Sequence, residues 1–170
     1  MRKIQLIVAM ILVTALANRL SAQDYKFGIG LRMSTATPSI SSSVSAKFFL
    51  NDRAAVEGLV SFSPDFGMGG LFEMHQLIGG IQGLNWFYGG GAYFGVKSDL
   101  VYSSPNGEGV SYGVKKNVVH TGPMGVVGID YKFDNAPINI SLDWKPELDI
   151  APAINFVPDA FALSVRFTLK

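Results

Sequence analysis

The chain has 170 residues and no cysteine, and its 14 Lys and Arg nearly balance its 13 Asp and Glu. This length suits one domain, the lack of cysteine excludes a disulfide framework, and the near-neutral charge excludes the concentrated basic patch that nucleic-acid binding requires. Only 16% of the residues are charged, against about a quarter in soluble globular domains.

The N-terminus is organised like a secretory signal peptide. The basic residues Arg2 and Lys3 precede a mostly apolar run over residues 4–16, and a polar segment follows that ends at Ala22. The apolar run is shorter than the ~20 residues that a membrane-spanning helix needs. We therefore expect cleavage near Ala22, with a signal peptide over residues 1–22 and one domain over residues 23–170.

Beyond the predicted signal peptide, apolar and polar residues alternate in eight segments. Their lengths are close to the roughly 9 to 11 residues that a tilted β-strand needs to cross a membrane. The segments are 25–34, 39–50, 54–64, 70–80, 85–97, 118–133, 137–149 and 160–170. The pattern predicts an all-β protein, an eight-stranded antiparallel up-and-down transmembrane β-barrel, because an even number of reversing strands can close on itself.

The lengths of the connections alternate as well. Brief, turn-like connections follow the second, fourth and sixth predicted strands, at residues 51–52, 80–83 and 134–136. Longer ones follow the third, fifth and seventh strands, at residues 64–69, 98–117 and 150–159. The first connection, residues 35–38, is the exception because it is nearly as short as a turn. Long and short connections at opposite ends are typical of outer-membrane barrels.

Charged side chains fall on one face of the predicted strands, among glycines and serines. Small residues beside long charged ones suit the inside of a narrow tube. We predict that this face lines the bore as a polar network formed by Lys26, Arg32, Lys47, Glu57, Glu73, His75, Asp130, Lys132, Asp143, Lys145 and Arg166. Because buried charges must be paired, the network is interpreted first as structural.

The opposite face is apolar, and its aromatic residues gather near the short turns. They are Tyr25, Phe27, Phe48, Trp86, Tyr88, Tyr131, Phe133 and Phe167, which predicts an interfacial girdle on a lipid-facing wall. An exported soluble lipocalin-like ligand-binding barrel has the same alternation with its faces exchanged, and it remains an alternative. The glycine-rich polar face, the banded aromatics and the low charge favour the membrane barrel.

The bore of an eight-stranded barrel is about filled by side chains, so we predict a protein without catalytic residues, cofactor or metal. His75 and Glu73 point the same way, a geometry that can serve acid–base chemistry. A histidine satisfied within a charged bore is the simpler interpretation. The sequence contains no Gly-x-Ser-x-Gly motif, metal-ligand cluster or phosphate loop.

Two roles remain open for such a barrel. A scaffold or surface-interaction protein would use its long loops, where Tyr102, Tyr112, Lys115, Lys116 and Phe156 are available for contact. A narrow channel for small solutes would instead depend on the bore. The expected partners are outer-membrane lipid and lipopolysaccharide, with the barrel-insertion machinery during assembly. We expect a monomer and no nucleic acid.

Three segments carry a family resemblance: "FEMHQLIGGIQGLNWFYGGGAYFG" (72–95), "GIDYKFDNAPINISLDWKPEL" (128–148) and "ALSVRFTLK" (162–170). Through them essentially the whole mature chain resembles the small outer-membrane β-barrel domain proteins of Bacteroidetes-type Gram-negative bacteria. More distantly, the layout is similar to OmpX-type barrels. The resemblance implies a barrel in the cell outer membrane with surface roles for its loops, and it names no activity. Many such barrels end in an aromatic residue that the insertion machinery reads, whereas this chain ends in Lys170.

Overall fold

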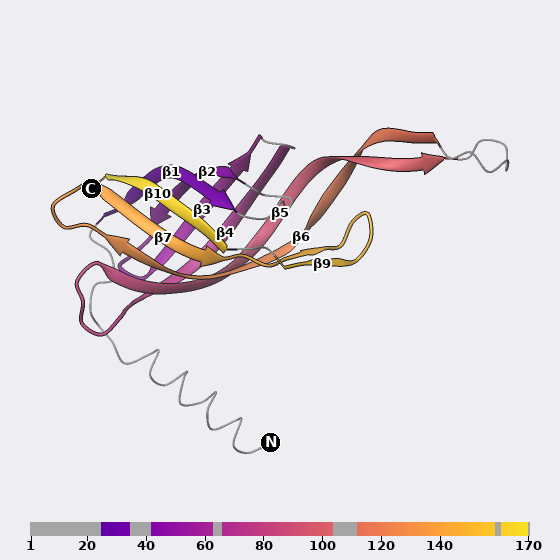
Figure 1. Ribbon diagram of the computed structural model, residues 1–170. Coiled ribbons are helices and arrows are strands. Elements are labelled where there is room, and N and C mark those ends of the chain that lie inside the picture. The colour runs from indigo at the N-terminus through magenta and orange to yellow at the C-terminus, as the bar shows by residue number, and fades with distance from the viewer. Residues whose placement is uncertain (1–24, 35–41, 63–65, 104–111, 159–160, 170) are drawn as a thin grey trace, which may run out of the picture.

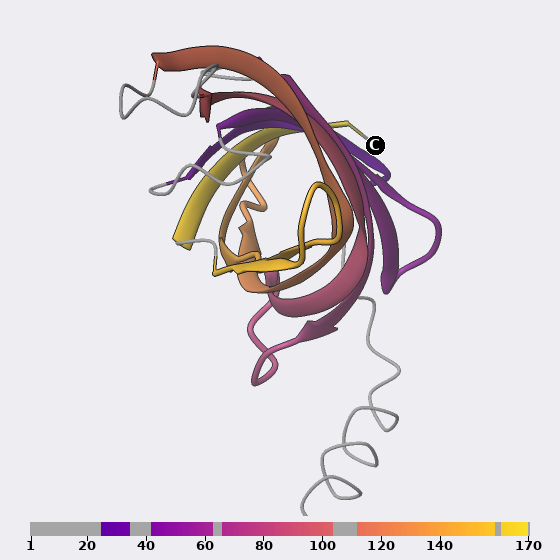
Figure 2. The same cartoon turned by 90° about the vertical axis from the view of Figure 1, so that its right-hand side faces the viewer.

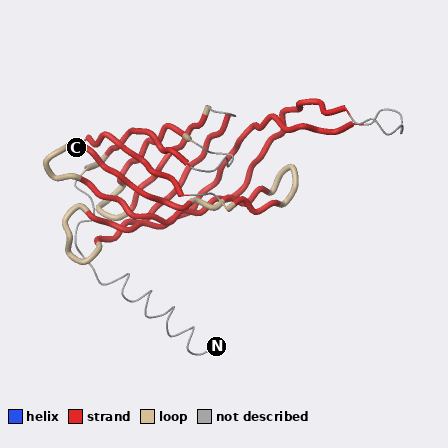
Figure 3. Tube along the Cα trace, viewed as in Figure 1, coloured by secondary structure: helices blue, strands red, loops and turns tan. Residues whose placement is uncertain are grey.

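The computed structural model describes residues 25–34, 42–62, 66–103, 112–158 and 161–169, and the predicted signal peptide lies outside these ranges. The described chain consists of β-strands and their connections (Figures 1 and 3). The strands are β1 (Phe27–Ser34), β2 (Ser43–Phe49), β3 (Ala54–Ser61), β4 (Phe66–Leu77), β5 (Leu84–Ser103), β6 (Tyr112–Lys132), β7 (Ile138–Trp144), β8 (Glu147–Asp149), β9 (Asn155–Val157) and β10 (Phe161–Leu169). Within the described ranges, no helix has the length and apolar character needed to cross a membrane.

Eight of these strands close into a barrel in the described part of the chain. Each of β1 to β6 pairs antiparallel with the next, and β10 pairs with both β7 and β1 to complete the circle. Figure 2 looks into this barrel from the end that carries the longer connections, here called the long-loop end. The connections after β2, β4 and β6 define the opposite, short-turn end. The predicted eight-stranded antiparallel barrel is therefore confirmed.

Exposed and buried side chains alternate along the strands of the barrel wall, and most of the large apolar ones lie outside. In β10 every second residue from Phe161 to Leu169 is exposed, and the residues between them are buried. Leu163 and Val165 are 42% and 41% exposed, whereas Ser164 and Arg166 are buried. This is the arrangement of a membrane barrel, since a soluble barrel would bury the apolar set.

Aromatic side chains ring the outer wall at both ends. The short-turn end carries Phe27, Phe48, Trp86, Tyr88, Tyr131, Phe133 and Phe167, as the sequence predicted. A second ring, which the sequence analysis missed, lies at the long-loop end and consists of Phe62, Phe66, Phe94, Trp144 and Phe161. Within this ring, Trp144 is the cross-strand partner of Phe161, and the ring centroids of Phe62 and Phe66 lie 5.8 Å apart. Two girdles are typical of a wall that crosses both membrane interfaces.

The longest predicted loop is largely a pair of strands. β5 and β6 remain paired from Leu84↔Tyr131 out to Ser103↔Tyr112, so most of the predicted loop 98–117 belongs to a two-stranded arm that projects from the long-loop end (Figure 1). Its Ser- and Gly-rich composition resembles that of a loop because the arm lies beyond the barrel wall, whose outer face requires apolar side chains at every second position.

Two other connections also differ from the prediction. β2 begins at Ser43, so the connection after β1 spans residues 35–42 and is longer than the predicted 35–38. β4 begins at Phe66, which leaves residues 62–65 in place of the predicted 64–69. Strand edges were misplaced because serine and glycine are common both in these strands and in loops.

The predicted seventh strand, residues 137–149, is divided into β7 and β8. Pro146 lies between them and cannot donate a backbone hydrogen bond, while its carbonyl accepts one from Gly125 N at 3.0 Å. β8 then pairs with β6 at Met124↔Glu147, and β9 folds back on β8. The predicted loop 150–159 therefore contains the second strand of a short hairpin.

Local chemistry explains two of the short turns. Asn51 Oδ1 accepts hydrogen bonds from the backbone N–H groups of Arg53 and Ala54 at 2.9 and 2.8 Å, closing the turn between β2 and β3. In the next turn Gly83 has φ of +83°, and a Cβ there would lie 2.3 Å from Lys132 O. Only glycine can combine that backbone conformation with such a close approach.

Candidate functional site

The bore of the barrel holds most of the buried charge. Nine of the eleven predicted bore residues are buried in the structure: Arg32, Lys47, Glu57, Glu73, His75, Asp130, Asp143, Lys145 and Arg166. They occupy alternate positions of their strands, so a two-residue period places them on one face. Seven barrel strands contribute to this set, so the bore is a site that almost every barrel strand helps to form.

Arg166 on β10 is the most connected of these residues. It forms an ion pair with Glu57 on β3, and its Nε donates to Ser45 Oγ on β2 at 2.7 Å. Its Nη1 donates to Ser141 Oγ at 2.8 Å and to Asn139 Oδ1 at 3.5 Å, both on β7. One guanidinium thereby joins four strands, which its planar fork of donors allows.

A second series of contacts starts at Lys47 on β2. Its Nζ lies 2.6 Å from Glu73 Oε2 and 3.5 Å from Glu57 Oε2. Glu73 Oε2 also lies 3.0 Å from His75 Nε2, and His75 Nδ1 lies 3.5 Å from Asp130 Oδ1. Asn139 Nδ2 donates to Asp130 Oδ2 at 2.8 Å.

These two sets of contacts close on each other, because Asn139 contacts both Asp130 and Arg166. We call the closed circuit the ionic ring; its members are Arg166, Glu57, Lys47, Glu73, His75, Asp130 and Asn139. It crosses the bore and ties together β2, β3, β4, β6, β7 and β10. Such a network stabilises one arrangement of strands because each buried charge has a partner.

Further ion pairs lie nearer the long-loop end. Arg32 on β1 donates to Asp143 on β7 through Nε at 3.2 Å and Nη2 at 2.6 Å. Lys145 Nζ lies 2.5 Å from Glu147 Oε1 on β8. Asp149, also on β8, accepts a hydrogen bond from the Tyr93 hydroxyl and lies 3.2 Å from His120 Nδ1.

The bore also contains apolar side chains that the sequence analysis did not place there. One cluster, here called the apolar layer, consists of Leu59, Leu71, Phe87, Tyr93, Met124 and Val126. Phe87 joins it to the ionic ring, since Lys47 Nζ lies 4.5 Å from its ring centroid and the His75 ring stacks on it at 5.0 Å. Phe87 and Tyr93 have the same two-residue phase as Gly89 and Gly91, two of the glycines on the face that was predicted to line the bore. The signal was therefore present in the sequence.

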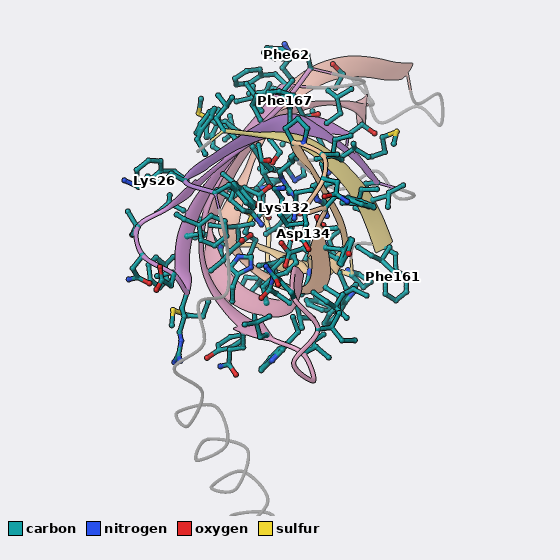
Figure 4. The ribbon with its side chains drawn as sticks, turned by 90° about the vertical axis from the view of Figure 1, so that its left-hand side faces the viewer. Lys26, Phe62, Lys132, Asp134, Phe161 and Phe167 are labelled. Atoms are coloured by element: carbon teal, nitrogen blue, oxygen red, sulfur yellow. The ribbon has the colours of Figure 1, made fainter. Side chains whose placement is uncertain are left out.

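Two predicted bore residues lie elsewhere. Lys26 is exposed outside the barrel, whereas Tyr25, predicted to face lipid, is 3% exposed (Figure 4). Both precede β1, so the alternation of the strand was extended over two residues that do not follow it. Lys132 is half-buried at the short-turn mouth of the bore, where its Nζ donates to Ala136 O at 2.9 Å.

The bore opens at the short-turn end into a vestibule of about 510 Å³. Gln82, Lys132, Asp134 and Thr168 are among its lining residues, and Figure 4 shows Lys132 and Asp134 within the outline of the barrel. Tyr25, which is buried, also lines it and packs edge to face on Phe49, with ring centroids 5.1 Å apart. The vestibule therefore leads to packed aromatic side chains.

The predicted loop residues are only partly within the described structure. Lys116 is exposed on β6, and Phe156 is 58% exposed on β9. The side chains of Tyr102, Tyr112 and Lys115 lie outside the described residues. The structure therefore places two of these five candidates on the surface.

The geometry of the charged residues does not favour catalysis. His75 and both of its carboxylate neighbours are fully buried, so a substrate has no approach to this group in the described structure. No cluster of three or more His, Cys, Asp or Glu within the described residues could hold a metal ion.

Comparison with known proteins supports the fold. No protein-family model and no curated protein sequence matches the chain. Among solved structures, the barrel is similar to the N-terminal β-barrel domain of Pseudomonas aeruginosa OprF, with a TM-score of 0.51 and 11% sequence identity over 85% of this chain and 96% of that one. At this identity the likeness shows a shared barrel fold.

Proposed function

We propose that the protein is a non-enzymatic integral barrel of the cell outer membrane, a scaffold that presents its long-loop end for contact. The observation that carries the proposal is the arrangement of the wall: a continuous apolar outer face between two aromatic rings, around a bore of paired charges. An apolar wall of this kind exposed to water would favour aggregation, whereas lipid covers it without cost.

The packed interior of the bore supports a role as a scaffold rather than as a pore. The ionic ring spans the interior, the apolar layer packs beside it, and Tyr25 with Phe49 and Ala55 forms a further cluster toward the short-turn end. Water or solute crossing this interior would have to separate buried ion pairs, and an unpaired buried charge is strongly unfavourable.

A narrow channel for small solutes is the second candidate, and the vestibule favours it. This cavity of about 510 Å³ has the buried Tyr25 among its lining residues, so it would offer solutes an entrance to the bore at the short-turn end. A path from the vestibule through the bore would then need the movement of a few side chains and no rearrangement of strands.

Conductance in planar lipid bilayers separates the two candidates. We expect the wild-type protein to give no defined single-channel openings. Asp143→Asn and Arg166→Gln alter buried charges, and Lys116→Gln is the matched control on the exposed surface. Defined openings whose size changes in the two bore variants and stays unchanged in Lys116→Gln would reject the closed scaffold in favour of a channel.

The proposal also covers how the protein reaches the outer membrane and what it contacts there. A signal peptide over residues 1–22 would direct export, the barrel-insertion machinery would fold the chain into the membrane, and the monomer would contact outer-membrane lipid and lipopolysaccharide. The resemblance to barrel proteins of Bacteroidetes-type bacteria supports this assignment. Cell fractionation tests it, because recovery of the folded chain in the soluble periplasmic fraction would exclude membrane integration.

A further inference from the structure

The hairpin formed by β8 and β9 has two chemically different faces. Leu148 pairs with Phe156, and Ile150 and Ile154 flank the turn beside them. These four residues are here called the hairpin apolar face. Leu148 is 37% exposed, Ile150 and Phe156 are each 58% exposed, and Ile154 is 82% exposed. The pairs Glu147↔Val157 and Asp149↔Asn155 have the opposite phase, and Glu147 and Asp149 are buried.

Contacts with the barrel fix the orientation of the hairpin. Asp149 is held by Tyr93 and by His120, and the backbone N–H of Ile150 donates to Thr121 O at 2.9 Å. β6 passes so close that a Cβ on Gly122 would lie 1.8 Å from Leu148 O. The polar face is therefore tied to the barrel, and the hairpin apolar face cannot turn inward to be buried.

The hairpin apolar face continues the outer wall of the barrel. Along β7 the outward residues are Leu142 and Trp144, which are 44% and 38% exposed, and Leu148 continues this outward apolar series beyond Pro146. Trp144 and its partner Phe161 belong to the aromatic ring of the long-loop end. The hairpin itself lies at the long-loop end of the barrel, beyond the level of that ring (Figures 1 and 2).

We propose that the hairpin apolar face docks on the membrane itself, in contact with the headgroup region of the outer leaflet at the long-loop end. Continuity with the lipid-facing wall identifies lipid as the occupant. In the described residues the far edge of β9 has no strand partner, and unpaired backbone groups are too costly for the hydrocarbon centre. The hairpin therefore lies at the interface, as amphipathic surface elements do.

This inference rests on the proposed membrane location, and single-cysteine labelling can test the two separately. The natural chain has no cysteine, so Ile154→Cys and Phe156→Cys each accept one environment-sensitive fluorophore. Asn155→Cys, between them on the other face, is the matched control. Leu163→Cys reports the barrel wall and Ser98→Cys the exposed arm. The labelled proteins are reconstituted into phosphatidylcholine vesicles, and folding is checked by the shift in gel mobility on boiling.

Quenching by brominated phosphatidylcholine and by aqueous iodide gives the readout. We expect labels at 154 and 156 to be quenched by the bromolipid at least twofold more than the label at 155, and more by shallow than by deep bromines. Iodide quenching as strong as at Ser98 would overturn the hairpin inference, and so would protection from both quenchers, which would indicate a protein partner or second copy. If the Leu163 label is also open to iodide and insensitive to bromolipid, the membrane location itself fails.

Discussion

Replacing Arg166 by Met is expected to lower the free energy of unfolding of the barrel by about 3–5 kcal/mol, the usual cost of breaking a buried ion pair. The reason is that Arg166 is buried and compensates Glu57, while also donating to Ser45 and Ser141. Without the guanidinium, a carboxylate and two hydroxyl groups lose a donor in the interior. Urea unfolding of the protein in lipid vesicles measures the change.

Two further variants show whether the loss comes from the unpaired charge. The double variant Arg166→Met/Glu57→Met removes both charges, and it should recover most of the stability because well-packed apolar pairs often replace buried ion pairs without loss. Lys26→Met is the surface control, since Lys26 is exposed, and it should leave the unfolding midpoint unchanged. A stability of Arg166→Met equal to that of Lys26→Met would contradict the ionic ring.

Replacing Gly91 by Ala is expected to destabilise the barrel by roughly 3 kcal/mol or more, at the upper end of the cost of overpacking. A Cβ at this inward position would lie 1.8 Å from Gly70 O on the neighbouring strand. The obstacle is backbone, so a rotamer change cannot relieve it. The shift in gel mobility on boiling measures the folded fraction, and urea unfolding measures the stability of whatever folds.

The neighbouring Gly70 supplies the matched control. It lies one residue away from the partner of Gly91 and faces outward, and a Cβ there would have no atom within 4 Å. Gly70→Ala should therefore fold normally and gain about 0.5–1 kcal/mol, because glycine within a strand costs conformational entropy. Equal behaviour of the two variants would show that the strands do not approach as closely as the structure has them.

The two-residue period was enough to predict which residues enter the bore wherever a strand is regular. Arg32, Glu57 and Arg166 each stand between uncharged neighbours. The alternation therefore shows which residues share the charged face, but it does not show whether that face points inward or outward. The choice of the inward face depended on the low charge, the banded aromatics and the glycines of the polar face. Glycines are informative because a narrow bore has room for a long side chain only beside a small one. Gly89 and Gly91 indicate this crowding directly.

Features that depend on strand ends were predicted less well. Lys26 and Tyr25 were assigned by extending an alternation that begins only at Phe27. The division of residues 137–149 at Pro146 was not predicted, so the hairpin that follows was taken for a loop. Proline marks an interruption in the sequence, but where the chain goes next depends on the pairing of Glu147 with Met124, which is a tertiary contact.

The closure of the ionic ring could not be derived from the sequence. Alternation predicts that Lys47 and Glu73 face inward, but it does not say which carboxylate each cation meets. That choice follows from the stagger between strands, which sets Lys47 opposite Glu57 and places Glu73 one strand further on. Partner assignment in a barrel therefore needs the register as well as the face.

The orientation of the barrel wall is the central claim, and a nitroxide scan along β10 tests it most directly. Single cysteines introduced at residues 161–169 of the cysteine-free chain carry the spin label, and collision rates with oxygen and with a water-soluble nickel complex are measured in phosphatidylcholine vesicles. We predict high oxygen and low nickel accessibility at Phe161, Leu163, Val165 and Phe167, and low accessibility to both at the residues between them. High nickel accessibility at Leu163 and Val165 would contradict a lipid-facing apolar wall.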